Sequence, residues 1–282
     1  MSHDASVEQQ ILATIDKWVE QELRPIAREF DQADEYPSDL VEQMKELGLF
    51  GATISEEYGG LGLSASTYAR IVSRICEVWM APSGIFNSHL IMASCVERAG
   101  TQAQKEHFLP KFATGELRGG IGLTEPDAGS DLQGIRLVAK KDGDHYVLNG
   151  TKTWISNGIK GNCLAVLTKT DPSASPPHRG MSLFICEKGE GFSVGKKLKK
   201  LGYRSIDSAE LIFEDFRVST DNLVGGKKAR ASSRLPVASS WGASILRRAA
   251  RGWRKVRPIW RCTTRWIEKL LARRLPSIKP FS

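Results

Sequence analysis

A short segment at residues 120–135, "GIGLTEPDAGSDLQGI", combines residue types that suit close contact with a polar ligand. Thr124 and Ser130 carry hydroxyl groups that can donate or accept hydrogen bonds. Gly129 lets the backbone approach a ligand closely, because glycine has no side chain. Glycine with small polar neighbours also forms ordinary turns, and the local pattern alone favours that simpler interpretation. The segment is therefore a candidate site whose meaning depends on its surroundings.

The residues before this segment predict helices. Between residues 7 and 30, apolar side chains recur at intervals of three and four, as on one face of an amphipathic helix. A second helix is expected after Pro37, with Ser38 as its N-cap and Gly48 at its end. Further helices are expected at about residues 69–76, 88–99 and 103–114. Residues 1–118 are accordingly predicted to form an all-helical N-terminal domain.

The pattern changes at Gly119. Residues 136–158 alternate apolar and polar side chains and contain the turn signals "KDGD" and Asn-Gly, which is typical of antiparallel hairpins. Short strand patterns follow at residues 163–170, 180–188, 192–198 and 208–218. We therefore predict an α+β protein, in which the helical domain is followed by an antiparallel β-barrel-like domain at residues 119–226.

The charge of the chain is divided unevenly. Residues 1–226 hold 24 basic and 31 acidic side chains, a net charge of −7, whereas residues 227–282 hold 16 basic side chains and one acid, Glu268. The second part also contains four of the seven tryptophans. Arginine with interleaved tryptophan suits nucleic acid or a membrane surface, so a basic binding appendage is one interpretation of residues 227–282.

Several classes of protein are disfavoured by composition. Five scattered cysteines without a CxxC pair indicate neither a disulfide framework nor a metal site, and we expect them to behave as small buried apolar residues. The longest apolar runs are too short for a membrane helix, and the N-terminal segment is acidic and amphipathic rather than signal-like. A cytoplasmic location is expected.

Several motifs, in this order and spacing, resemble the flavin-dependent acyl-CoA dehydrogenase family. They are "EEYGGLG", "FLPKFATGE", "GLTEPDAGSD", "NGTKTWISNG", "KLGYRSIDSAELIFEDFRV" and "DNLVGG". The resemblance covers residues 5–226. It implies a helical N-terminal domain, a β-barrel-like middle domain and a C-terminal four-helix domain, assembled as a homo-oligomer.

The resemblance also implies FAD as cofactor and assigns its contacts. In this chain they would be Ile121, Gly122, Leu123, Thr124, Gly129, Ser130, Trp154, Ile155 and Ser156. The Thr124 hydroxyl would bond the pyrimidine side of the flavin, and the Trp154 indole would cover the ring and exclude water. Taken alone, Trp154 could equally be an ordinary core residue.

Three residues are implied as substrate contacts. Ser130 would lie near the acyl-CoA, Thr170 would touch its CoA moiety, and Phe86 lies on a helix that faces the acyl pocket in relatives. His89 lies on the same helix, although an isolated histidine is more often structural. Asp127 departs from the small residue common at its position and adds a charge near the flavin loop.

The family reaction removes the α proton of an acyl-CoA thioester with a glutamate while a β hydride passes to the flavin, giving the trans-2-enoyl-CoA. In the family, that glutamate belongs to the C-terminal domain and lies on a late loop or, in some branches, on the first long helix. Glu268 matches neither position. We therefore expect that this chain lacks the catalytic base and the four-helix domain, and that it is truncated and inactive as written.

A frameshift near Gly226 explains residues 227–282 in another way. One permitted set of codons for "WGASILRRAARGW", at residues 241–253, spells "GRINIAARGAGVA" in a neighbouring frame, which resembles the first helix of the family's C-terminal domain. Two further stretches behave alike. On this hypothesis the basic tail is not a native domain, and its charge says nothing about a partner.

Other functions stay open beside the dehydrogenase. Residues 1–226 fit an acyl-CoA oxidase or a flavin monooxygenase of the same superfamily, and the tail leaves a DNA-associated, non-catalytic relative possible. The partners implied are an acyl-CoA substrate and an electron acceptor such as electron-transfer flavoprotein in intact relatives, with no membrane partner and nucleic acid disfavoured.

Overall fold

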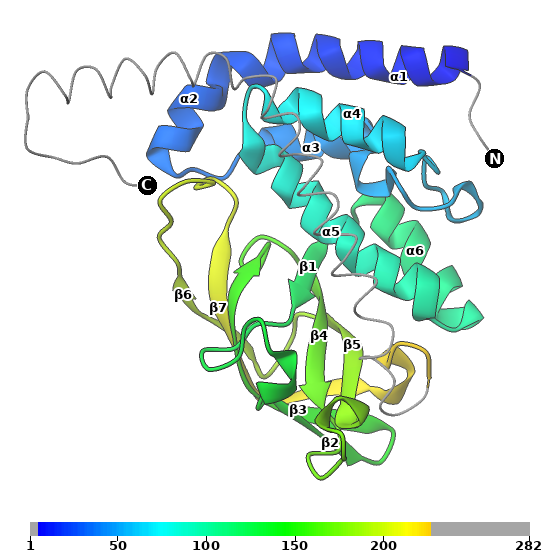
Figure 1. The fold of residues 1–282 in the computed structure, drawn as a ribbon, viewed down its shortest axis with the longest axis vertical. Coiled ribbons are helices and arrows are strands. Elements are labelled where there is room, and N and C mark those ends of the chain that lie inside the picture. Colours follow the sequence, from blue (N-terminus) through cyan, green and yellow to red (C-terminus); the bar gives the residue numbers. More distant parts are fainter. Residues whose placement is uncertain (1–4, 227–282) are drawn as a thin grey trace, which may run out of the picture.

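The computed structural model describes residues 5–226 of the chain, and the N-terminal helices come first (Figure 1). α1 (Ala5–Trp18) continues through a π-helical turn (Val19–Leu23) into α2 (Arg24–Ala33). The helix expected at residues 7–30 is therefore confirmed, with one irregularity inside it. Pro25 explains the position of the π-helical turn, because proline has no N–H to donate to the preceding turn of the helix. The Trp18 indole anchors the assembly by donating to Gln43 Oε1 at 2.7 Å.

Four more helices complete the layer: α3 (Ser38–Glu46), α4 (Ala65–Cys76), α5 (Met80–Ala99) and α6 (Gln102–Thr114). The prediction of Ser38 as N-cap is wrong, since Pro37 holds that position and no side chain caps the helix. Gly48, with φ 71°, follows the end of α3 as expected. α5 begins eight residues before Ser88, because Pro82 lies in its first turn, where a missing N–H costs nothing.

The seven strands form one curled sheet in the order β1-β4-β2-β3-β7-β6, with β5 paired to β4. Their bounds are β1 (Gly119–Gly122), β2 (Val138–Asp142), β3 (His145–Ser156), β4 (Cys163–Lys169), β5 (Met181–Glu187), β6 (Phe192–Lys197) and β7 (Ser208–Ser219). The predicted α+β class, with helices followed by a barrel-like sheet, is confirmed. Four strand pairs are antiparallel as expected.

β1 differs from the expectation, because it pairs parallel to β4 and makes the sheet mixed. The strand enters from α6, and the β2–β3 hairpin separates it from β4 along the chain. The sequence of β1 does not show the alternation of apolar and polar residues that is typical of a strand, because three of its four residues are glycines. They serve close contact, since a Cβ at Gly119 would lie 1.5 Å from the carbonyl oxygen of Cys163.

The two Asn-Gly pairs do different things. Asn157 and Gly158 follow the end of β3, whereas Asn149 and Gly150 lie within it, where the register against β7 shifts. Across this bulge, Asn149 Nδ2 donates to the Asp215 carboxylate, and the backbone N–H of Asp215 donates to Asn149 Oδ1. The turn predicted at "KDGD" does connect β2 to β3, and it places Gly143 at φ 60°.

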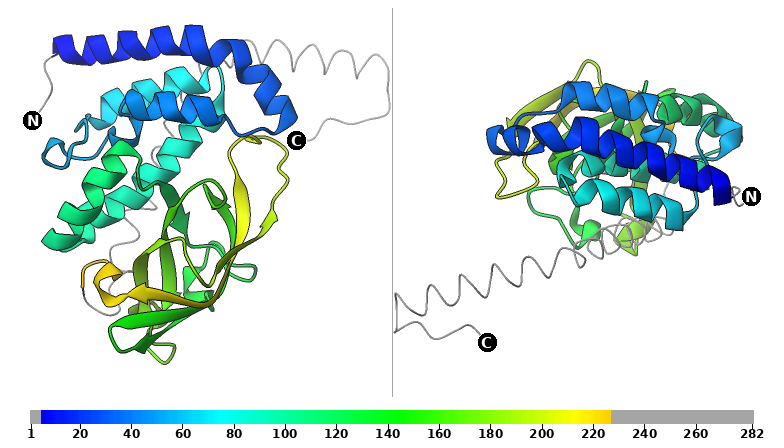
Figure 2. Two further views of the ribbon diagram at one scale, coloured as in Figure 1. Left: turned by 180° about the vertical axis from the view of Figure 1, so that it is seen from behind. Right: turned by 90° about the horizontal axis from the view of Figure 1, so that it is seen from above.

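Two apolar cores meet at β4. The larger core joins the helices to alternate residues of the strand, Cys163, Ala165 and Leu167. The smaller core fills the concave side of the sheet and takes Leu164 and Val166. Burial on both faces explains the uninterrupted apolar run of this strand. Figures 1 and 2 show α5 between the outer helices and the sheet.

Other expectations concern single residue types. Cys76, Cys95, Cys163 and Cys186 are buried and free, as predicted for small apolar residues. None of the described helices is both long and apolar enough to cross a membrane. Among residues 5–226, no three His, Cys, Asp or Glu side chains gather into a group that could hold a metal ion. The frameshift hypothesis and Glu268 concern residues outside the described range.

His89 is buried where α5 meets α6. Its Nε2 lies 2.9 Å from the carbonyl oxygen of Phe112, and its ring packs edge-on against Phe50 and Phe112. Within residues 5–226, Nδ1 has no hydrogen-bond partner that meets the geometric limits for such a bond. Burial lowers the pKa of His89 from 6.5 to about 4, with a smaller contribution from the positive charge of Arg118. The neutral ring is therefore the form that fits the core.

His89 makes stability depend on pH. Between about pH 6.5 and 4, the unfolded chain binds a proton at His89 that the folded chain does not, so the free energy of unfolding falls as the pH falls. We expect His89→Gln to reduce this loss by up to about 3 kcal/mol. Urea unfolding followed by circular dichroism at several pH values measures it.

The matched control is His107→Gln, which makes the same replacement at an exposed position of α6. An unchanged pH slope in His89→Gln would contradict the prediction.

Candidate functional site

The loop that follows β1 lies against β3. The backbone N–H of Thr153 donates to the carbonyl oxygen of Thr124 at 2.9 Å. One strand position earlier, Lys152 Nζ donates to the carbonyl oxygen of Leu123 at 3.1 Å. Residues 121–124 and 154–156, which are far apart in the sequence, are therefore neighbours in the fold. The structure brings these two parts of the predicted flavin site together.

A buried ion pair fixes this contact. Lys152 is 0% exposed and Glu125 is 6% exposed, and Lys152 Nζ lies 2.8 Å from Glu125 Oε1. The Glu125 carboxylate also accepts the backbone N–H groups of Arg136 and Leu137, at 2.5 and 3.1 Å. Desolvation lowers the pKa of Lys152 to about 8, although the negative charge of Glu125 acts in the opposite direction.

Trp154 is an exposed aromatic side chain at the end of β3. It is 55% exposed and has φ 59°, a left-handed conformation that costs a bulky residue energy. The residue lies in a β-bulge, where the register between β3 and β7 shifts between Lys152 and Ile155. The bulge turns the indole out of the sheet, while Ile155 returns to the smaller core at 2% exposure.

Three hydroxyl side chains of the predicted flavin site have no partner within residues 5–226. Within the part of the chain that the structure describes, the side chains of Thr124, Ser130 and Ser156 form no hydrogen bond, and Thr124 and Ser156 are only half-buried. A Cβ placed on Gly129 would meet no atom within 4 Å. Free donors next to an exposed flat ring suit a planar ligand with a polar edge. This donor set fits a flavin.

The residue after this contact connects it to the helices. Asn157 is 1% exposed, has φ 59°, and donates from Nδ2 to the carbonyl oxygens of Ile85 in α5 and Gly119 in β1 at 2.8 and 2.7 Å. Its backbone N–H donates to the carbonyl oxygen of Asp207 at 3.2 Å. Sequence reasoning missed this role. An asparagine directly after a strand, where left-handed backbone is common, was the available signal.

The residues predicted to contact substrate occupy different surroundings. Ser130 is exposed on the loop. Thr170 is 9% exposed, and its hydroxyl lies 2.8 Å from that of Ser182 and 3.2 Å from the carbonyl oxygen of Gly180. Phe86 is 0% exposed and packs edge-on against Tyr68, with ring centroids 6.2 Å apart. The structure does not bring Thr170 and Phe86 to the exposed loop with Ser130.

The unusual acid of the loop has a partner of its own. Asp127 Oδ2 lies 3.1 Å from the Arg136 guanidinium, and both side chains are largely exposed. This pair offsets the charge that Asp127 adds. Since exposed pairs contribute little to stability, Asp127 leaves the shape of the loop to the buried pair.

Comparison with known proteins extends these observations. Residues 6–116 match a family model described as acyl-CoA dehydrogenase, N-terminal domain, and residues 120–216 match acyl-CoA dehydrogenase, middle domain. Isovaleryl-CoA dehydrogenase from Pongo abelii is 39% identical over 222 residues, which are 77% of this chain and 52% of that protein. The chain spans about half the length of the curated relatives it matches.

Solved structures agree with this relationship. An acyl-CoA dehydrogenase from Geobacillus kaustophilus superposes with a TM-score of 0.83 at 35% identity, over 89% of this chain and 66% of that chain. An acyl-CoA dehydrogenase from Bacillus anthracis, solved in complex with FAD, has a TM-score of 0.79 at 30% identity, over 89% and 42%.

The buried ion pair has a measurable effect on stability. We expect Lys152→Met to lower the free energy of unfolding by about 3 kcal/mol, because the Glu125 carboxylate would stay buried without its cation. The double variant Glu125→Gln with Lys152→Met should lose less than the sum of the single variants, since no buried charge is then left without a partner, while the single amide oxygen can still accept one of the two backbone N–H groups. Urea denaturation measures all three.

Lys197→Met is the control, because Lys197 pairs with Asp34 at 3.2 Å while 47% exposed. Its cost should be below about 1 kcal/mol. Equal losses in Lys152→Met and Lys197→Met would contradict the assigned role of the buried pair.

Proposed function

Since the chain belongs to the acyl-CoA dehydrogenase family, we propose that residues 5–226 supply the flavin-facing and acyl-facing parts of an FAD-dependent acyl-CoA dehydrogenase. The reaction would be the α,β-dehydrogenation of an acyl-CoA thioester to the trans-2-enoyl-CoA. The observation that carries this proposal is the exposed Trp154 indole, held in a strained bulge next to the free hydroxyl groups of Thr124 and Ser156.

FAD, when bound, would accept the hydride removed from the β carbon of the substrate. The chain's own contribution would be orientation and hydrogen bonding. The Thr124 hydroxyl would donate to the polar edge of the ring system, and the Trp154 indole would cover the ring and keep water away. The backbone around Ile121, Gly122 and Leu123 would form the wall of this site, held by the Lys152–Glu125 pair. Gly129 leaves room above the loop.

The acyl-CoA would approach from the exposed side of the same loop. Ser130 would offer its hydroxyl to the thioester end, since this residue is exposed and its side chain forms no hydrogen bond within residues 5–226. The Thr170 hydroxyl is occupied within the β4–β5 hairpin, so a CoA contact there would need these bonds to rearrange. Phe86 is fully buried, so it would support the wall of the acyl pocket from behind and would not touch the substrate directly.

We propose that residues 1–282 do not supply the catalytic base. The resemblance implies that this glutamate lies in the C-terminal domain. Residues 227–282 contain one acid, Glu268. The proposal is that the 282-residue chain binds FAD weakly and does not catalyse dehydrogenation by itself. A homo-oligomer, a cytoplasmic location and an electron acceptor such as electron-transfer flavoprotein belong to the same proposal for the intact protein.

FAD titration tests the flavin site. We expect the purified chain to bind FAD weakly, and Trp154→Ala to weaken this binding about fivefold, as for the loss of one aromatic stacking contact. Quenching of flavin fluorescence measures the affinity. The control is Leu201→Ala, since Leu201 is fully exposed on the β6–β7 loop and lies outside the proposed site.

An affinity that does not change in Trp154→Ala would contradict the proposed flavin contact. Stoichiometric FAD in the purified chain, together with dehydrogenation of an acyl-CoA, would contradict the proposed inactivity instead. Reading the coding DNA checks the frameshift hypothesis separately, because the neighbouring frame must encode the predicted helix beyond Gly226 if the hypothesis is right.

A further inference from the structure

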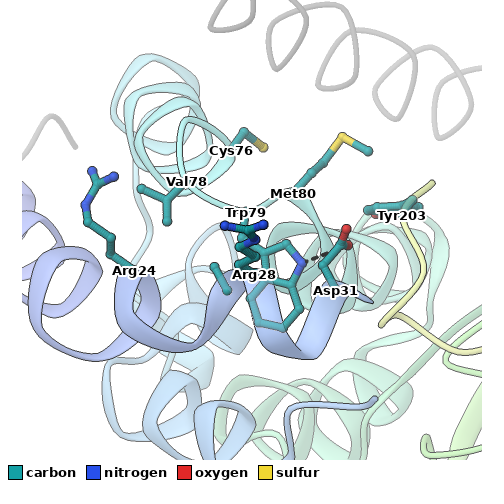
Figure 3. A pocket seen from close by; sticks show the side chains of 9 residues that line it. Arg24, Arg28, Asp31, Cys76, Val78, Trp79, Met80 and Tyr203 are labelled. Carbon is teal, nitrogen blue, oxygen red and sulfur yellow. Dashed lines mark hydrogen bonds between the residues drawn. The ribbon is translucent and has the colours of Figure 1, made fainter. Parts of the chain in front are cut away.

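A pocket of about 440 Å³ lies between α2, the α4–α5 junction and the β6–β7 loop, in the helical half of the molecule (Figure 3). The flavin loop and Trp154 do not contribute to its lining. Its volume is in the range of small-molecule sites, and too small for a nucleotide with its pantetheine arm. The nature of its lining determines what could bind there.

One wall of the pocket is cationic. Arg24 and Arg28 lie four residues apart, on one face of α2. Both Glu20 oxygens accept hydrogen bonds from Arg24, at 2.7 and 2.9 Å, so its charge is largely compensated. Arg28 forms no ion pair within the described residues. It is a cation without a partner at the edge of a concave surface.

The acid of the same helix face is already engaged. Asp31 Oδ1 accepts a hydrogen bond from the Trp79 indole N–H at 3.2 Å, the dashed line in Figure 3. This bond holds the indole in place, and Trp79 is further packed against Phe30, with ring centroids 6.2 Å apart. Trp79, 5% exposed, and Met80 thus provide an apolar surface next to Arg28.

Tyr203 closes the other end. Its hydroxyl rests against the backbone of α5, since a Cβ on Gly84 would lie 1.4 Å from the oxygen. The residue has φ 59°, and Lys200 Nζ lies 5.3 Å from its ring centroid. Burial raises the pKa of Tyr203, so the hydroxyl stays protonated at neutral pH. It forms no hydrogen bond within residues 5–226, and is therefore a free donor held in a strained conformation.

We infer that this pocket binds an amphipathic monocarboxylate, with its carboxylate at Arg28, its apolar body against Trp79 and Met80, and the Tyr203 hydroxyl as a further donor. The inference is independent of the flavin site. A cationic ligand is disfavoured because Arg28 has no ion-pair partner within the described residues, whereas Asp31 already accepts the Trp79 indole N–H. A neutral ligand would leave the unpaired Arg28 without a counter-charge.

The probe is 3-phenylpropionate, which joins one aromatic ring to one carboxylate, and 3-phenylpropionamide is its uncharged match. Binding to the full 282-residue chain is followed by the indole N–H resonances in two-dimensional NMR, with the Trp79 signal assigned from Trp79→Phe. We expect 3-phenylpropionate to shift the Trp79 signal at millimolar concentration. The amide should bind about fivefold more weakly, as should the carboxylate to Arg28→Gln, which is the effect of one exposed ion pair.

Arg70→Gln is the matched control, because Arg70 is exposed on α4 and does not line the pocket. Its affinity for the carboxylate should equal that of the unchanged chain. Val78→Trp, which places a ring inside the pocket, should abolish the shift. The inference is overturned if 3-phenylpropionate leaves the Trp79 signal unmoved. It is also overturned if 3-phenylpropionate binds Arg28→Gln, and 3-phenylpropionamide binds the unchanged chain, as tightly as 3-phenylpropionate binds the unchanged chain.

Discussion

The Lys152–Glu125 ion pair is the interaction on which the candidate site depends. Taking two charges out of water costs several kcal/mol per ion, and the cost is recovered only when both charges are closely paired and hydrogen-bonded. Here the carboxylate has a lysine and two backbone N–H groups, and the lysine has a further carbonyl oxygen. If the loop moved away from β3, the Lys152 charge would lose its partner while still buried in surroundings of low dielectric constant. The loop is therefore held in one position.

Asn157 extends this constraint into the helical half. The strand residues Trp154 and Ser156 lie between two fixed points, the buried ion pair on one side and the three hydrogen bonds of Asn157 on the other. Left-handed backbone at Trp154 and at Asn157 is costly, and the surrounding bonds keep both residues in it. The exposed indole is thus held in place by the packing beneath it, and the proposed flavin contact would share the rigidity of the two cores.

Periodicity in the sequence was enough to predict the helices and most strands, because a buried face repeats every 3.6 or two residues. It could not show β1, whose glycines have no side chains to alternate. No local pattern indicates that Lys152 is buried, because lysine is usually a surface residue and its partner Glu125 lies in a separate loop. The pocket at Trp79 joins three segments that no local pattern relates. The flavin roles proposed for the hydroxyl groups and the indole come from resemblance to a family and not from any local pattern.

β4 has a consequence for how the molecule holds together. The two faces of this strand belong to two different cores. If β4 moved away from one core, its residues would also leave the other core. The larger core itself runs from Ile15 to Ile206, across the gap between the two family models. Evolutionary modules and cooperative units therefore do not coincide in this chain. We therefore expect helices and sheet to unfold together, and the amide hydrogens of β4 to exchange slowly with solvent.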